Sequence, residues 1–123
     1  MSPTTIFTCL GIGIIGGIVA ALCGVGGGVV MVPAFVGLLG MTQKPAVATS
    51  LAVIIPTAIA ASLQNARAGL VDWRVAAATA VSACVFSYMG AGWLRAMSNE
   101  SLTRIFGVVL VVLGGRMLLT GRA

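Results

Sequence analysis

The chain has 123 residues, of which 59% are hydrophobic and only 7% are charged, which excludes a soluble domain with its roughly 25% of charged residues. The net charge of +5 comes from scattered cations without a basic cluster or interleaved aromatics, so a nucleic-acid surface is excluded and contact with anionic membrane lipid is expected. This length allows one domain, and we expect residues 1–123 to form a single transmembrane domain.

The first apolar stretch, residues 5–39, contains no Lys, Arg, Asp, Glu, His, Asn or Gln. Its first part, about Thr5–Leu22, would be a helix of about 27 Å and is long enough to cross a bilayer. The sequence CGVGGGVVMVP then interrupts the stretch at Cys23–Pro33. The remaining part, Gly28–Leu39, is too short to cross squarely and is predicted to be a half-helix.

This glycine break is the most informative feature of the chain. Irregular backbone at membrane depth is tolerated only where protein buries it or where it lines a polar cavity. A half-helix starting after the break would direct free N–H groups and a positive dipole end into such a cavity, as in transporters that hold anions near the midplane. We therefore expect Gly26, Gly27 and Gly28 to contact an anion.

Close helix packing is the alternative role for the break, because Gly24 and Gly28 have the spacing of a GxxxG motif. A bulky residue at Gly27 is expected to separate the two roles. A packing role predicts lost assembly or folding, whereas a substrate role predicts lost binding in an intact oligomer.

Three further apolar segments follow, at about Ala46–Ser62, Trp73–Leu94 and Ser101–Leu119. A polar turn, MTQKP, precedes the first of them, and Ser98 or Asn99 is expected to cap the last. The predicted fold class is therefore an all-α integral membrane protein with about four transmembrane helices plus a glycine-broken half-helix.

The segment that contains Pro56 carries most of the polar residues that could serve a site. Thr49 and Ser50 are hydroxyls at its expected start, able to donate to an anion or to cap the helix. Pro56 frees a carbonyl near residue 52, which Thr57 and Ser62 could repair locally. Asn65 and Arg67 end the segment, and an arginine there would either attract anions to an entry funnel or anchor the helix at the interface.

The cations divide almost evenly between the two sides of the membrane, whether the first two segments cross once or twice. The positive-inside rule then gives almost no orientation, which would permit an antiparallel homodimer unless one arginine suffices to orient the chain. One side would hold Arg67, Arg74, Arg116 and Arg122, and the other Lys44, Arg95 and Arg104.

The chain lacks the residues that proton-coupled export, enzymatic catalysis and metal binding require. The two acidic residues, Asp72 and Glu100, fall between the apolar segments, so a proton-coupled multidrug exporter lacks its membrane carboxylate. The chain has no His and no P-loop, and its three cysteines lie apart. We therefore expect no enzyme activity, no cofactor and no metal site.

Three blocks of sequence resemble the sulfite exporter TauE/SafE family of membrane transporters. They are GVGGGVVMVPAFVGLLG, AVATSLAVIIPTAIAASLQNARAGLVDWR and GAGWLRAMSNESLTRIFGVVLVVLGGRMLL, which together cover about residues 5–120. The resemblance implies transport of sulfur-containing anions, such as sulfite or organosulfonates, across the bacterial inner membrane. It also implies that Gly26–Gly28, Pro33, Thr49 and Ser50 lie near the substrate.

Members of that family are typically about twice this length and contain two repeats of the pattern, whereas this chain has one. The resemblance therefore implies one repeat of an inverted-repeat transporter that works as a homodimer or with a separately encoded second half. A non-functional remnant is a further possibility. The competing hypothesis is a membrane assembly subunit that packs against a partner protein and has no pathway of its own.

Overall fold

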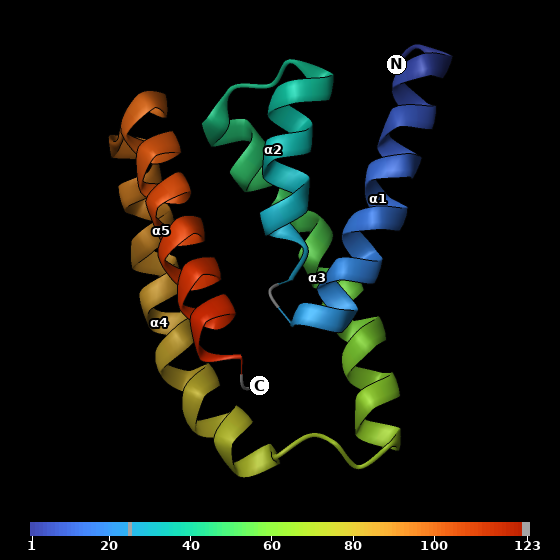
Figure 1. Ribbon diagram of the computed structural model, residues 1–123, viewed down its shortest axis with the longest axis vertical. Coiled ribbons are helices and arrows are strands. Elements are labelled where there is room, and N and C mark those ends of the chain that lie inside the picture. The colour runs from blue at the N-terminus through green and yellow to red at the C-terminus, as the bar shows by residue number, and fades with distance from the viewer. Residues whose placement is uncertain (25, 122–123) are drawn as a thin grey trace.

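The computed structural model describes residues 1–24 and 26–121, and all regular structure in that part of the chain is helical (Figure 1). Four of the helices are long and apolar enough to cross a membrane, whereas α2 has 12 residues and a length of about 18 Å. The predicted fold class is confirmed. The helices are α1 (Pro3–Cys23), α2 (Gly28–Leu39), α3 (Gln43–Arg67), α4 (Trp73–Ala96) and α5 (Asn99–Thr120).

Helix α2 reverses the direction of α1 and returns toward the end of the molecule where the chain begins (Figure 1). It packs against both α1 and α3. The buried apolar residues lie along this three-helix contact, with Met31 and Val32 of α2 only 1% and 2% exposed. The short helix is therefore the core of the bundle. Helices α1 and α2 together begin and end on the same side of the bundle.

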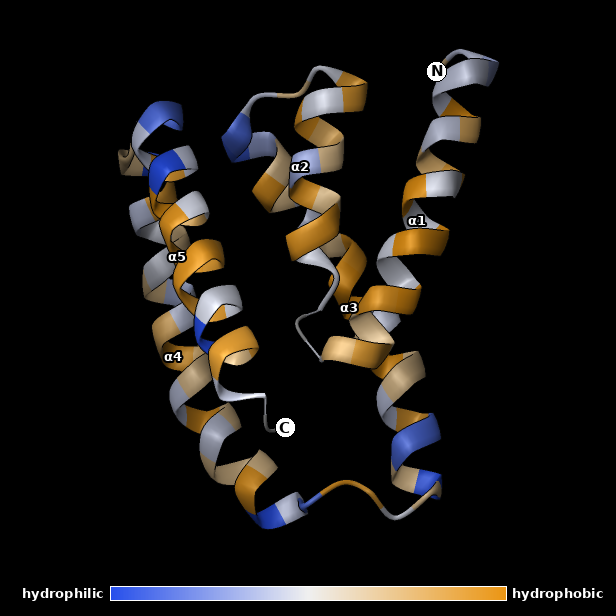
Figure 2. Cartoon of the chain, viewed as in Figure 1, coloured by the Kyte–Doolittle hydropathy of each residue, from blue (hydrophilic) through white to orange (hydrophobic). Residues whose placement is uncertain are grey.

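The glycine break lies halfway along the bundle. A methyl group added at Gly26 would lie 3.2 Å from Cδ1 of Ile54, which occupies the middle of α3. Hydrophilic residues gather at the two ends of the helices, and apolar residues fill the length between them (Figure 2). Because α3 is long and apolar enough to cross a membrane, we expect the break to lie near mid-membrane depth.

Helix α3 begins at Gln43, three residues before the predicted start at Ala46. Lys44 therefore lies in the first helical turn together with Pro45, where a proline costs nothing because the first N–H groups have no intrahelical acceptor. The Lys44 N–H instead donates to the Oδ1 of Asn99, 3.0 Å away on α5. The predicted polar turn is shortened by this arrangement.

The same helix continues through Pro56 to Arg67, beyond the predicted end at Ser62. The Thr57 hydroxyl donates to the carbonyls of Val53 and Ile54, at 3.0 Å each. These two carbonyls are not the one that Pro56 leaves without its donor, which belongs to residue 52, so the bonds of Thr57 do not make the expected repair. Helix α3 nevertheless continues past the depth of the glycine break.

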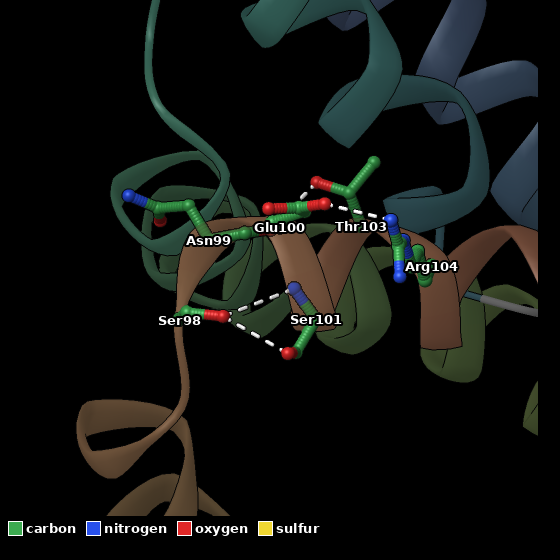
Figure 3. A network of polar contacts seen from close by, with 6 residues as sticks. All are labelled: Ser98, Asn99, Glu100, Ser101, Thr103 and Arg104. Atoms are coloured by element: carbon green, nitrogen blue, oxygen red, sulfur yellow. Dashed lines mark hydrogen bonds and ion pairs between the residues drawn. The ribbon is translucent and has the colours of Figure 1, made fainter.

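Side-chain caps start the last two helices. The Asp72 carboxylate accepts from the N–H groups of Arg74 and Val75 and so caps α4. Ser98, one of the two expected caps, accepts from the Ser101 N–H at 3.2 Å (Figure 3). Neither α4 nor α5 contains a buried residue, although α5 packs against α3 and Phe106 contacts the core, so much of the surface of both helices faces the surroundings of the chain.

The positions of the described cations agree with the predicted division. The Lys44 ammonium donates to the Arg95 carbonyl at 3.2 Å, which places the α2–α3 and α4–α5 turns at one end. Arg67 and Arg74 flank the α3–α4 turn at the other end. Arg122, which entered the predicted count, lies outside the described residues.

Replacing Asp72 with alanine removes the oxygen that accepts two backbone N–H groups at the start of α4. We expect the free energy of unfolding to fall by about 1 kcal/mol, the usual effect of losing an N-cap. Denaturation of the detergent-solubilised protein, followed by circular dichroism, measures this loss. Asp72→Ser, which keeps an accepting oxygen, should stay close to the wild type, and equal losses in both variants would contradict a capping role.

Candidate functional site

The turn between α1 and α2 is built from glycines in left-handed conformations. Gly24, Gly26 and Gly27 have φ angles of 69°, 73° and 78°. Residues with a Cβ avoid this region because the side chain approaches the following carbonyl. The Gly24 N–H donates to the Ala20 carbonyl and ends α1, and Gly27 is the N-cap of α2. The glycines therefore supply the left-handed conformations that this turn requires.

Helix α2 therefore begins with backbone donors in the interior of the bundle. The N–H groups of Val30 and Met31 donate to the Gly27 carbonyl, at 3.1 and 2.8 Å. The N–H groups of Gly28 and Val29 stand at positions for which an α-helix supplies no acceptor, and Gly27 has no side chain to cap them. The positive end of the helix dipole lies at the same place.

A cavity of about 590 Å³, here named the first hollow, opens between α1, α2 and α3 toward the end where the chain begins. Hydroxyl and sulfur groups line it together with apolar side chains. Its lining residues are Met1, Thr4, Thr5, Thr8, Cys9, Ile12, Gly13, Met31, Phe35, Leu38, Leu39, Met41, Thr49 and Val53.

A smaller cavity of about 170 Å³, here named the second hollow, lies on the opposite side of the glycine break. It is formed by the end of α1, the glycine turn and the second half of α3. None of the described residues that line it carries a charge. They are Ala20, Ala21, Gly24, Gly26, Thr57, Ala58, Ala61, Ser62 and Asn65.

The second hollow brings together two of the residues singled out in the sequence, Gly26 and Asn65. They are far apart in the chain and meet because α3 passes the turn between α1 and α2. Gly26 directly precedes Gly27, the N-cap of α2, so the glycine turn borders this hollow. On the α3 side it is lined by the Asn65 amide and by the Thr57 and Ser62 hydroxyls, of which the Thr57 hydroxyl donates to the carbonyls of Val53 and Ile54.

Thr49 and Ser50 lie in the second turn of α3 and not at its start, so the expected role as helix caps is wrong. Thr49 lines the first hollow. Ser50 is 2% exposed and its hydroxyl donates to the Val47 carbonyl at 2.8 Å. It faces Gly28, where an added methyl group would be 3.8 Å from the Ser50 Oγ. The serine thus lets α2 and α3 approach closely.

Gly27 has a packing role of its own. A methyl group added there would lie 2.9 Å from the carbonyl oxygen of Gly16 and 3.3 Å from Cε of Met31. A bulky residue at Gly27 would therefore push α1 and α2 apart whatever the glycine does toward a ligand. The expected use of Gly27 to separate packing from substrate contact is wrong for this steric reason.

Pro33 and Arg67 lie outside both hollows. Pro33 is exposed on α2, and Arg67 is exposed at the end of α3, two residues beyond Asn65. Arg67 therefore does not line the second hollow, although it follows Asn65 by two residues. Within this single chain, Pro33 contributes its fixed backbone to the half-helix rather than a surface of either cavity.

Sequence reasoning missed several polar residues that line the hollows. Thr4 and Thr8 are one helical turn apart on α1 and face the first hollow, and Thr57 and Ser62 face the second. The spacing of Thr4 and Thr8 was a usable signal, because hydroxyls four residues apart share a helix face. Within the described residues, no three His, Cys, Asp or Glu side chains gather into a metal site.

The profile of the sulfite exporter TauE/SafE family matches residues 9–123, nearly the whole chain. The chain belongs to the TauE/SafE family. This confirms the resemblance carried by the glycine break and the ATS and LTRIF blocks. With its four candidate spans and its bacterial relatives, this TauE/SafE chain is a multi-pass bacterial membrane protein.

Two curated relatives are named as probable membrane transporter proteins. YunE of Bacillus subtilis (strain 168) is 32% identical over 85% of this chain, and a protein of Haemophilus influenzae is 29% identical over 95% of it. The matches cover 38% and 47% of those proteins, so the TauE/SafE chain spans less than half the length of these relatives. No solved structure matches it.

Gly27→Ala and Gly28→Ala form a matched pair for the geometry of the TauE/SafE glycine break. Gly27 needs a left-handed backbone, which costs a residue with a Cβ about 1–2 kcal/mol, and its methyl group would also meet the Gly16 carbonyl. Gly28 is helical, and a methyl group added there would lie 3.7 Å from its nearest neighbour, Cδ1 of Ile54. Alanine at Gly28 should therefore be neutral or stabilising by up to about 1 kcal/mol. Unfolding in detergent measures both, and equal effects would contradict the described turn.

Proposed function

We propose that this TauE/SafE chain is one half of a secondary transporter for small sulfur-containing anions, such as sulfite or organosulfonates, and performs no enzymatic step. The observation that carries this proposal is the start of α2 at mid-membrane depth, next to an uncharged polar hollow. Backbone N–H groups and a helix dipole can balance an anion there without a buried cation. Family membership and the names of the relatives support the same class of function.

We further propose that the pathway is completed by a second half, either a second copy of the chain or a separately encoded repeat. The chain spans less than half of its curated relatives. Helices α4 and α5 have no buried residue, and apart from the contact of α5 with α3 their surfaces are open to lipid or to another half. In this arrangement, rocking of one half against the other would expose the site alternately to the two sides of the membrane.

The second candidate is an assembly subunit that packs against another membrane protein. The observation in its favour is that Gly27 fits closely against the Gly16 carbonyl, so part of the glycine motif serves helix packing. This role does not account for the second hollow, which Asn65 and Ser62 line with polar groups. The anion transporter explains both features and is therefore preferred.

The proposal predicts that sulfur-containing anions stabilise the detergent-purified protein. Thermal unfolding should be recorded with sulfite, thiosulfate, a short organosulfonate, sulfate and chloride. A ligand at 100 times its dissociation constant adds about 2.7 kcal/mol to the native state, which is readily seen as a rise in melting temperature. We expect that rise with sulfite or sulfonates and not with chloride.

Asn65→Leu should reduce the rise, because it removes an amide that lines the second hollow. Gln64→Leu is the matched control, since Gln64 is the preceding exposed residue of α3 and does not line this hollow. No stabilisation by any of these anions, in protein that remains folded, would contradict the transporter and favour the assembly subunit.

A further inference from the structure

The two hollows occupy successive lengths of the same helices and do not share a lining residue. Along α1, the first hollow uses residues 4–13 and the second uses residues 20–24. Along α3, the first uses residues 49 and 53 and the second uses residues 57–65. The part of the bundle between residues 13 and 20 of α1 therefore separates them.

Met31 fills this separating layer. It is the largest fully buried side chain of the described residues, at 1% exposure, and it also lines the first hollow. A methyl group added at Gly16 would lie 2.7 Å from the Met31 Cε, and one added at Gly27 would lie 3.3 Å from the same atom. The end of the thioether side chain thus rests on two glycines, one on each side of the turn.

Ile54 completes the layer from α3. Its Cδ1 would be 3.2 Å from a methyl group at Gly26 and 3.7 Å from one at Gly28. The neighbouring residues of α3 divide between the hollows, since Val53 lines the first and Thr57 the second. Two apolar side chains, those of Met31 and Ile54, therefore lie between the two hollows.

We propose that Met31, seated on Gly16 and Gly27 and supported by Ile54, is the gate between the two hollows. This inference rests on the proposed function, because it takes the hollows as two parts of one anion pathway. The unbranched methionine side chain can change rotamer without movement of the backbone, since it has three rotatable bonds and a polarisable thioether. When it leaves its seat, the space over the glycines joins the first hollow to the donor end of α2.

The test is the efflux of radiolabelled sulfite from proteoliposomes that contain the purified full chain. Met31→Ala removes the side chain that fills the layer, so we expect efflux about tenfold faster than in the wild type, corresponding to a barrier lowered by about 1.4 kcal/mol. Met31→Leu keeps the volume and should retain a closed layer. Stabilisation by sulfite should persist in both variants, because Met31 does not line the second hollow.

A second pair of variants tests the seat itself. Alanine at Gly16 would force the Met31 Cε to move, whereas alanine at Gly17 meets no atom within 4 Å. We expect faster sulfite efflux with Gly16→Ala and wild-type efflux with Gly17→Ala. This pair also tests the gate if Met31→Ala fails to fold. Ile54→Val is a further test, because it shortens the supporting side chain and should also make sulfite efflux faster.

The outcomes separate the gate from the proposed function. Suppose that the wild type shows both sulfite efflux and stabilisation by sulfite. If the efflux rate is then unchanged in Met31→Ala, and is the same in Gly16→Ala as in Gly17→Ala, the gate is overturned and the transporter remains. Absence of efflux and of stabilisation in every folded variant would overturn both. Faster efflux of sulfite in Met31→Ala and Gly16→Ala, with Met31→Leu and Gly17→Ala unchanged, would establish the gate.

Discussion

The rest of the bundle depends on one constraint, the close reversal of the chain between α1 and α2. Gly24, Gly26 and Gly27 adopt left-handed backbone conformations, and Gly27 lies directly against the carbonyl of Gly16. Because the reversal is this tight, α2 can pack along both α1 and α3 and form the buried core. The same reversal places the start of α2, with the positive end of its helix dipole, halfway along the bundle.

The second hollow has no charged side chain among the described residues that line it. The described residues that line the second hollow include hydroxyls, an amide and glycine backbone, and the charged residues Arg67 and Arg74 stay at the end of the bundle. A buried cation would bind an anion strongly, but it would carry a large desolvation cost whenever the site is empty. Backbone dipoles avoid that cost and bind more weakly, which would suit the proposed transporter because it has to release its substrate.

Sequence reasoning predicted the helices and the break because both have local causes. Apolar length determines α1, α4 and α5, and consecutive glycines determine the turn. It was wrong about the start of α3, because the Asn99 side chain that accepts from Lys44 N–H comes from 55 residues away. Gly26 and Asn65 line the same hollow, whereas the adjacent residues Thr49 and Ser50 differ, since Thr49 lines the first hollow and Ser50 is buried. Both results depend on tertiary packing that a linear motif does not contain.

The central claim is that a polar hollow reaches the glycine break at mid-membrane depth. Labelling by a membrane-impermeant thiol reagent tests it most directly, in a chain whose three native cysteines are replaced by serine. Ala61→Cys places the thiol in the second hollow, and Ala60→Cys, its neighbour on α3, places it outside. The account predicts rapid labelling of Ala61→Cys that sulfite slows, and little labelling of Ala60→Cys. Equal labelling at both positions, or labelling at Ala61→Cys that sulfite leaves unchanged, would contradict it.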